Sequence, residues 1–161
     1  MVAPLDGFHL PNATLDERGL RKVKGAPETF DCEGFVLSLA RARDEDQTIL
    51  WPAFHRGLDE PTPDEIVIPT ETKLVVVEGN YLLLEQPCWR DVHTLLDDVW
   101  YVDAPPELLR GRLTERAIAF GRSEEEARRH VNGSDMRNVE LVARTKEQAS
   151  RRVQSGSFLL G

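Results

Sequence analysis

Short apolar runs, separated by stretches with helical spacing of apolar residues, set the pattern of this chain. Two runs rich in β-branched residues, Lys73–Glu78 and Val99–Asp103, predict strands buried on both faces, as in a parallel sheet. Trp89–Leu96 lies between them and can form a helix, so the three segments predict a right-handed βαβ unit. A further apolar run, Val2–Leu5, predicts the end of another strand.

Apolar positions at helical spacing predict the remaining helices. Residues 32–43 form an amphipathic helix behind Asp31, whose side chain suits an N-cap. Three more helices are predicted in the last third of the chain: one opened by Pro105 and Pro106 and ended by Gly121, one capped by Ser123 with Glu126 and running to about Val131, and one starting at Ser134 or Asp135. Ser155–Gly161 is a weakly patterned tail.

Two stretches of the first half predict loops. Thr48–Trp51 and Glu65–Ile68 are β-rich, and Pro52–Asp64 between them holds aromatic, charged and proline residues. We predict a long connection there, and long connections in compact domains are often functional. Residues 11–27 are polar and rich in Gly, Lys and Arg, so they predict a loop with one helical turn near Asp16–Leu20.

The composition fits one globular domain. The chain has 161 residues, of which 40% are apolar and 30% charged, which is ordinary for a soluble protein. Lys and Arg number 20 against 28 Asp and Glu, which gives a net charge of −8. A chain this acidic is a poor candidate for general binding of nucleic acid or anionic membranes, although it can still hold a local basic pocket.

The chain's start, its longest apolar runs and its cysteines indicate a cytoplasmic protein. Residues 1–6 carry neither the basic region nor the long apolar stretch of a signal peptide. The longest apolar runs, Leu74–Val77 and Tyr81–Leu84, are far shorter than a membrane span. Cys32 and Cys88 form no C-x-x-C pair, so we expect reduced thiols with a structural role.

Acidic residues follow three of the predicted strands: Asp6, Glu78 and Asp103. Ligands of open α/β sheets bind at the carboxyl ends of strands, where carboxylates can hold Mg²⁺ or accept a proton from a hydroxyl. Each position also has a plainer interpretation. Asp6 with Gly7 can simply form a turn, and Asp103 can cap the helix that follows Pro105.

Arginines form the second candidate feature. Arg112 and Arg116 are four residues apart and therefore share one face of a helix. Arg122, Arg128 and Arg129 follow. On spacing alone these arginines form a solvated face paired with nearby glutamates. The functional interpretation is a mobile lid whose arginines close over phosphates.

Six pieces of the sequence carry a resemblance to a known family. They are D-G-F-H (Asp6–His9), K-G-A-P-E-T-F-D (Lys24–Asp31), P-A-F-H-R (Pro52–Arg56), V-V-V-E-G-N-Y-L-L-L (Val75–Leu84), R-L-T-E-R (Arg112–Arg116) and S-D-M-R-N-V-E-L-V (Ser134–Val142). In this order they resemble the P-loop small-molecule kinases related to uridine kinase, pantothenate kinase and phosphoribulokinase, and most closely bacterial nucleoside/nucleotide kinase-like and fructose-transport kinase-like proteins. The resemblance implies an α/β fold of the P-loop NTPase type, with three layers, a mainly parallel sheet and a lid helix pair.

The resemblance also implies residue roles. Asp6 matches the base that takes the proton of the acceptor hydroxyl, and Glu78 matches a carboxylate that supports Mg²⁺, partly through water and together with Asp6. Arg112 and Arg116 match lid arginines that bind ATP and neutralise phosphate charge, which fits phosphoryl transfer. The acceptor pocket is implied at His9, Phe30, His55, Arg56 and Tyr81. Phe30 and Tyr81 can instead belong to the core, and His55 can simply line a loop.

The sequence lacks one signature of this family. The phosphate-binding pattern G-x-x-x-x-G-K-[ST] is absent, since none of the eleven glycines is followed by lysine. We therefore expect residues 1–161 to form a single, N-terminally incomplete kinase-like domain with a lid at about 110–135, and little activity from this chain. Upstream DNA is then predicted to encode an in-frame Gly-Lys-Ser or Gly-Lys-Thr. Beyond Ala149 the sequence departs from the family's apolar strand.

The sequence leaves two main functions open. The first is a kinase that transfers phosphate from ATP, with Mg²⁺, to a hydroxyl of a small molecule such as a nucleoside, a pantothenate-like compound or a sugar. The second is a non-catalytic kinase-fold remnant that binds a partner or small acceptor. A homodimer is compatible with both. A nucleic-acid-binding module is disfavoured by the net charge of −8.

Overall fold

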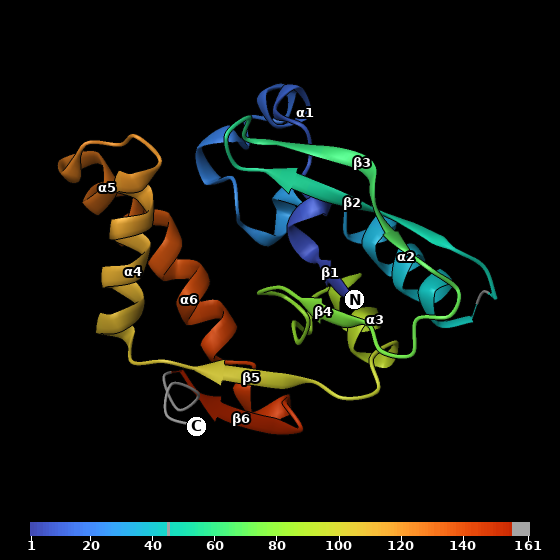
Figure 1. The fold of residues 1–161 in the computed structure, drawn as a ribbon. Coiled ribbons are helices and arrows are strands. Elements are labelled where there is room, and N and C mark those ends of the chain that lie inside the picture. The colour runs from blue at the N-terminus through green and yellow to red at the C-terminus, as the bar shows by residue number, and fades with distance from the viewer. Residues whose placement is uncertain (45, 156–161) are drawn as a thin grey trace. The chain divides into compact units, whose positions relative to one another are not determined.

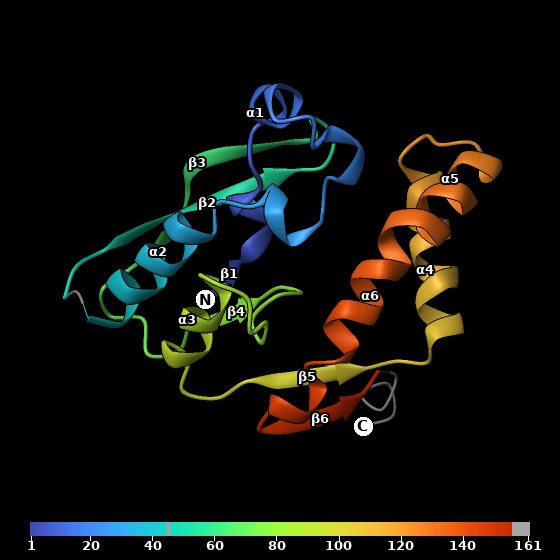
Figure 2. The same ribbon diagram turned by 180° about the vertical axis from the view of Figure 1, so that it is seen from behind.

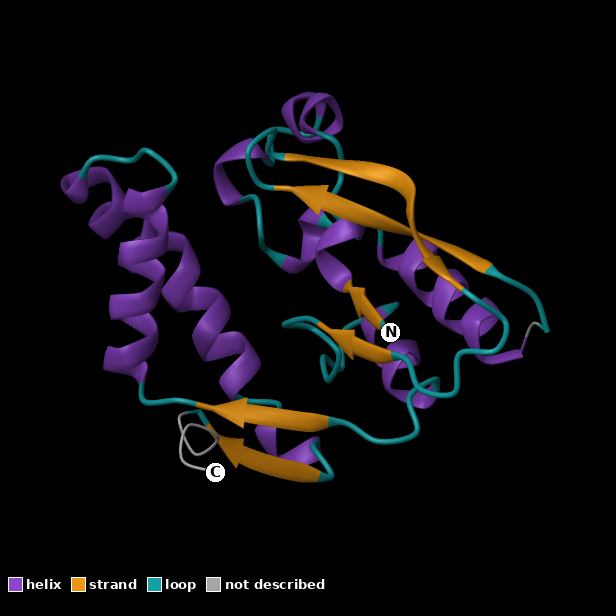
Figure 3. Ribbon diagram, in the orientation of Figure 1, coloured by secondary structure: helices purple, strands orange, loops and turns teal. Residues whose placement is uncertain are grey.

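The structure is a computed structural model that describes residues 1–44 and 46–155. The chain divides into two compact units, Met1–Asp97 and Asp98–Gly161, and each is treated separately below (Figure 1). Within the described residues, the strands pair as three two-stranded sheets (Figure 3). No helix in this part of the chain is long and apolar enough to cross a membrane.

The first sheet of unit 1 joins β1, Val2–Pro4, to β4, Val76–Glu78. The strands run parallel, with Pro4 opposite Glu78, so the predicted strands are confirmed. The predicted burial of Lys73–Glu78 on both faces is wrong, because Leu74 is 69% exposed and Val76 is 49% exposed. The β-branched run at Lys73–Glu78 therefore predicted a strand correctly, but it did not predict whether that strand is buried.

The second sheet of unit 1 is an antiparallel hairpin of β2, Ile49–His55, and β3, Glu60–Ile68. The predicted long loop at Pro52–Asp64 is therefore wrong, since most of it extends both strands. Proline is tolerated here because it lies on edge strands and at an irregularity. The register shifts between Trp51 and Ala53, on either side of Pro52.

The helices of unit 1 surround an aromatic core. They are α1, Asn12–Glu17, α2, Cys32–Asp44, and α3, Trp89–Thr94, with short 3₁₀ turns η1, Leu5–Phe8, η2, Arg21–Val23, and η3, Pro27–Thr29. The helical turn predicted at Asp16–Leu20 lies a few residues too late, whereas the predicted cap of α2 is confirmed, because the Asp31 carboxylate accepts from the Gly34 amide at 3.0 Å. Helix α2 packs beside the hairpin (Figures 1 and 2). The aromatic core consists of Phe8, Phe30, Phe35, Trp51, Tyr81 and Trp89.

The two cysteines correct a sequence-based expectation. Cys32 and Cys88 form a disulfide, with Cα atoms 6.2 Å apart and a separation of 56 positions in sequence. They were expected as separate reduced thiols, because sequence spacing cannot show that the starts of α2 and α3 meet. The bond ties these two helices together beside the aromatic core.

Unit 2 contains a parallel pair of strands and a helical segment. Strand β5, Trp100–Asp103, pairs with β6, Arg151–Gln154, and the helices are α4, Pro106–Ala119, α5, Glu124–His130, and α6, Met136–Ala143, with a π turn η4, Val131–Asp135, and a 3₁₀ turn η5, Lys146–Gln148. The capping box of Ser123 and Glu126 is confirmed.

Three expectations for unit 2 are wrong. Trp100 and Val102 are 51% and 66% exposed, so β5 is not buried on both faces. Asp103 ends β5 and does not cap α4, whose N-cap is Pro105. Strand β6 was missed because it reads R-R-V-Q, with one half-buried apolar residue to mark it. The tail beyond Ser155 lies outside the described residues.

Candidate active site

Two carboxylates meet at one end of the β1–β4 sheet. Glu78 is the last residue of β4, and Asp6 lies in η1, two residues after β1. Because the strands are parallel and Pro4 lies opposite Glu78, both carboxylates belong to the carboxyl end of the sheet. The predicted placement of these two acids at neighbouring strand ends is thus confirmed.

An arginine from the hairpin joins them. Arg56 follows β2, and its Nη2 donates to Oδ2 of Asp6 at 2.7 Å, with both side chains partly exposed. The pKa of the Glu78 carboxyl is raised, first by reduced solvation and second by the negative charge of Asp6, while Arg56 partly offsets both. Glu78 is exposed, but the charges of Asp6 and Arg56 still act on its carboxyl.

Two glycines allow this arrangement. A Cβ on Gly7 would lie 2.1 Å from the Pro52 carbonyl oxygen, so only glycine lets η1 approach β2 this closely. A Cβ on Gly79 would lie 2.6 Å from the Cβ of Leu5. The Asp-Gly and Glu-Gly pairs therefore have a packing reason: each glycine brings the segment of its acidic neighbour against another part of unit 1.

His9 lies next to Asp6 in a stack of rings. Its Nδ1 lies 2.8 Å from the Asp6 carbonyl oxygen, and its ring centroid lies 4.0 Å from Phe30 and 4.7 Å from Phe54. Burial lowers the pKa of His9, and the charge of Lys24 lowers it further. The hydrogen bond to Asp6 and the charges of Asp6 and Asp59 act in the opposite direction.

The other predicted acceptor residues have structural contacts. Phe30 and Tyr81 are buried in the aromatic core, and the Tyr81 hydroxyl donates to the Gly25 carbonyl. His55 pairs through Nε2 with Oε2 of Glu65 at 2.5 Å across the hairpin. Their roles in acceptor binding stay predictions.

A cavity of about 360 Å³ opens beside His9. Its lining residues are Gly7, Phe8, His9, Leu10, Pro11, Asp31, Pro52, Pro61 and Pro63. The lining is mostly apolar, with His9 and Asp31 among its residues. Small-molecule sites commonly combine such surfaces with a few polar groups.

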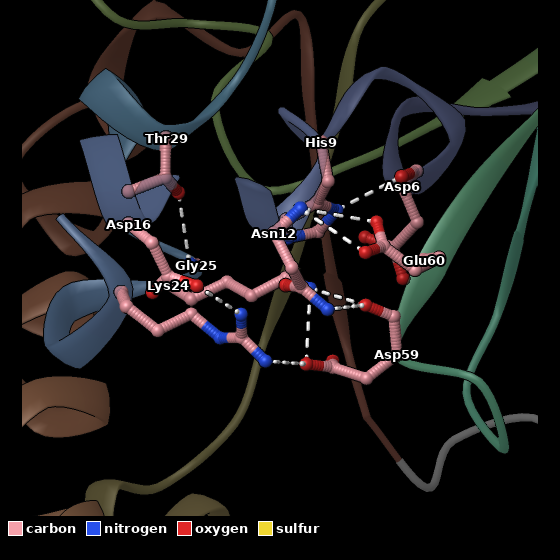
Figure 4. Close-up of polar contacts among 10 residues, drawn as sticks. Asp6, His9, Asn12, Asp16, Lys24, Gly25, Thr29, Asp59 and Glu60 are labelled. Atoms are coloured by element: carbon pink, nitrogen blue, oxygen red, sulfur yellow. Dashed lines mark hydrogen bonds and ion pairs between the residues drawn. The ribbon is translucent and has the colours of Figure 1, made fainter. Parts of the chain in front are cut away.

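Sequence reasoning missed the cluster around Lys24. Lys24 lies within one of the six motifs, but its polar partners come from other segments: Asn12 on α1 and Asp59 at the hairpin turn (Figure 4). Contacts of this kind join residues more than ten positions apart, and no spacing rule in one sequence reveals them.

The predicted lid arginines lie in unit 2. Arg112 on α4 donates to the Ser155 hydroxyl at 2.8 Å, and Arg116 lies in the last turn of the same helix. Arg128 and Arg129 pair with Glu124 and Glu125, which agrees with a solvated face for those two. Phosphate binding by Arg112 and Arg116 stays a prediction.

Unit 2 has a cavity of its own, of about 350 Å³, at the ends of β5 and β6. Tyr101, Asp103, Leu109, Lys146 and Gln154 are among its lining residues. Burial and the Asp103 charge raise the pKa of Tyr101. Asp103 therefore faces this cavity from the end of its strand.

The carboxylates can be compared with metal-site chemistry. Within the described residues, no group of three or more His, Cys, Asp or Glu side chains is arranged to hold a metal ion. Mg²⁺ in phosphate-transferring sites commonly takes one or two carboxylates and keeps water and phosphate oxygens as its other ligands. The pair of Asp6 and Glu78 fits that smaller requirement.

Comparison with known proteins places the chain in a family. No protein-family model matches it. It is 37% identical over 147 residues to YggC of Escherichia coli, covering 91% of this chain and 60% of YggC. It is 33% identical over 125 residues to an ATP-dependent kinase-like protein of Aspergillus versicolor, covering 73% of each chain.

A solved structure agrees. The crystal structure of a candidate fructose transport system kinase from a Silicibacter species matches with a TM-score of 0.89 and 33% identity, over 94% of this chain and 73% of that one. The chain thus spans less than two thirds of YggC and about three quarters of the Aspergillus and Silicibacter proteins. Motif order, the α/β fold and these relatives lead to one conclusion: the chain belongs to the P-loop small-molecule kinase family.

Proposed function

We propose that this chain takes part in transferring the γ-phosphate of ATP to a hydroxyl group of a small molecule. The supporting observation is the meeting of Asp6 and Glu78 at neighbouring parallel strand ends, with Arg56 bound to Asp6. Phosphoryl transfer depends mainly on positioning and electrostatic stabilisation, and this end of the sheet offers groups for both.

In this proposal Asp6 is the general base. Its carboxylate accepts the proton of the acceptor hydroxyl, and Arg56 orients that carboxylate through the 2.7 Å ion pair. His9 accepts or donates at the ring nitrogen that does not face the Asp6 carbonyl, toward the acceptor. The cavity beside His9 gives a small molecule room next to these groups.

Glu78, together with Asp6, would hold Mg²⁺ in part through water. When bound, the ion supplies positive charge that neutralises phosphate oxygens. The pKa of Glu78 is raised first by reduced solvation and second by the charge of Asp6, and a cation there would favour the ionised form of both acids.

Further parts of the proposal come from the resemblance. Residues 110–135 would form the lid, and Arg112 and Arg116 would bind the phosphates of ATP. Residues 1–161 would belong to one kinase domain, working in the cytoplasm and compatible with a homodimer. His55, Phe30 and Tyr81 would support the acceptor pocket, whose acceptor is a nucleoside, a pantothenate-like compound or a sugar.

A second function is favoured by one sequence fact. The 161 residues contain no G-x-x-x-x-G-K-[ST] pattern, which supplies the amides that cradle ATP phosphates. A kinase-fold protein that binds an acceptor or partner without turning over ATP would need no such pattern. For the same reason we expect little phosphoryl transfer from this chain by itself.

Calorimetry and a phosphate-transfer assay on the 161-residue chain test both functions. The chain is titrated with a nucleoside, pantothenate and fructose, and then assayed with ATP and Mg²⁺. We expect binding of one acceptor class, and any measured transfer should fall roughly 100-fold or more in Asp6→Asn. Glu71→Gln, an exposed acid in a loop, is the matched control.

The outcomes separate the two functions. Transfer that depends on Asp6 rules out the non-catalytic function and the expectation of inactivity. Acceptor binding without ATP binding supports the non-catalytic function for this chain. Transfer that Asp6→Asn leaves unchanged would show that Asp6 is not the base.

A further inference from the structure

The Lys24 side chain is nearly buried and has no part in the proposed chemistry. Only 12% of it is exposed, and its ammonium lies among oxygen atoms (Figure 4). It donates to Oδ1 of Asn12 at 2.7 Å and to the Asp59 carbonyl oxygen at 2.6 Å, and it pairs with the Asp59 carboxylate at 3.1 Å. An ammonium has three protons to donate, and these acceptors can take all of them.

These contacts tie the hairpin turn to two other segments. Asn12 itself donates through Nδ2 to the Asp59 carbonyl oxygen at 2.8 Å, and its backbone amide donates to the Glu60 carboxylate at 3.1 and 3.2 Å. Arg21 adds a longer contact to the Asp59 carboxylate at 3.8 Å. Asp59 has a positive φ of 53°, a strained conformation for a residue other than glycine, and such conformations persist where surrounding contacts hold them.

A second set of contacts leads from Lys24 to Asp6. The Lys24 ammonium lies 5.0 Å from the ring centroid of Phe54, within the range of a cation–π interaction. Phe54 stacks on His9, and Nδ1 of His9 lies against the Asp6 carbonyl oxygen. Arg56, three residues before Asp59 on the same turn, pairs with the Asp6 carboxylate.

We propose that Lys24 is a positioning residue for the acceptor side of the site. It holds the turn at residues 56–59 through Asp59 and holds the Phe54 ring against His9. Asp59 and Phe54 lie on either side of Arg56 in sequence, so holding them also positions Arg56 against Asp6. The consequence for phosphate transfer rests on the proposed function, whereas the positioning of His9 and of the turn does not.

The ring contact between Phe54 and His9 makes this position measurable. The Lys24 ammonium lies 5.0 Å from the centroid of the Phe54 ring, and the centroid of that ring lies 4.7 Å from that of His9. Without the ammonium we expect the Phe54 ring to lose this contact and the turn to open.

The test uses NMR on the full chain with neither ATP nor acceptor. Lys24→Met keeps the aliphatic stem and removes the charge, and Lys22→Met, at an exposed lysine two residues away, is the matched control. In Lys24→Met we expect weaker nuclear Overhauser effects between the ring protons of Phe54 and His9, whose rings are in contact in the wild type. We also expect roughly tenfold faster hydrogen exchange at the Leu58 amide, which bonds to the His55 carbonyl inside the turn.

A general loss of stability gives a different result. It would also speed exchange at the Phe35 amide, which bonds to the Asp31 carbonyl at the start of α2, and it would leave the turn no faster than the rest. That result, or unchanged contact between the Phe54 and His9 rings in folded Lys24→Met, overturns the proposal. Retained phosphate transfer or acceptor binding has no bearing on these readouts, so failure here is distinct from failure of the proposed function.

A second variant applies where Lys24→Met does not fold. Asn12→Ala leaves the ammonium in place and removes one of its acceptors, together with one donor to Asp59. We expect faster exchange at Leu58, by a smaller factor than in Lys24→Met, because the ammonium keeps its contacts with Asp59. Unchanged exchange at Leu58 in this variant also overturns the proposal.

Discussion

At the residue scale, the main feature of the site is the pair of Asp6 and Glu78. Folding brings these two negative charges close together, which is unfavourable in free energy. Glu78 gains protons more readily in the folded chain than in the unfolded one, because reduced solvation and the Asp6 charge both raise its pKa. Arg56 offsets part of this effect and also holds Asp6. A cation bound between the two acids would favour the ionised form of both.

The pH dependence of stability follows from this sign. The pKa of Glu78 is raised on folding, so stability falls as pH rises from its ordinary value of 4.5 through the folded value. Glu78→Gln should therefore be more stable than the wild type at pH 7, and the difference should shrink at pH 4. Urea denaturation at both values measures it, with Glu71→Gln as the control. An equal difference at the two pH values would contradict the direction of the shift.

At the scale of elements, the sequence predicted whether a segment is a helix or a strand better than it predicted how strands are buried or paired. Helix α2 and the capping box of α5 were predicted because their signals are local: the Asp31 cap and the Ser123–Glu126 pair. The hairpin was mistaken for a loop because prolines suggest breaks, although edge strands and irregularities accept them. The burial of β4 and β5 was overestimated, because an apolar run does not show whether other elements pack on its two faces.

The disulfide is an element-scale feature that the sequence analysis did not predict. It joins α2 and α3 at Cys32 and Cys88, which lie 56 positions apart. Disulfides persist mainly in oxidising compartments, so this bond and the predicted cytoplasmic location point in opposite directions. The two cysteines can pair because the starts of α2 and α3 lie close together in the fold. The spacing of cysteines in a single sequence does not give that distance.

Removal of the disulfide should lower the free energy of unfolding by about 2–4 kcal/mol, because the unfolded chain gains freedom. The double variant Cys32→Ser with Cys88→Ser tests this in urea, and the wild type with a reductant is the matched control. The unreduced wild type should resist alkylation by iodoacetamide. Labelling of both cysteines in the unreduced, folded protein would show that the bond does not form.

At the scale of the whole molecule, the candidate site groups fall into two sets. Asp6, His9, Lys24, Arg56 and Glu78 all lie in unit 1, Met1–Asp97. The predicted lid arginines lie in unit 2. Both sets are expected in one chain of this family, because the resemblance implies acceptor-side residues and lid arginines together. The sequence predicted the position of Asp6 and Glu78 at strand ends, and their role in a site stays a prediction. It did not predict the contacts of Lys24, whose partners are distant in sequence.

Unit 1 should therefore keep its acceptor-side arrangement without unit 2. A fragment of residues 1–97 contains both strands of the β1–β4 sheet, the hairpin, the aromatic core and the disulfide. We expect it to fold and to keep the lowered pKa of His9 and the slow exchange at Leu58, because the groups that act on His9 all lie within it. NMR titration of the fragment beside the full chain measures this. A His9 that titrates as in an unfolded peptide, in a fragment that is otherwise helical by circular dichroism, would show that the site needs unit 2 for its geometry.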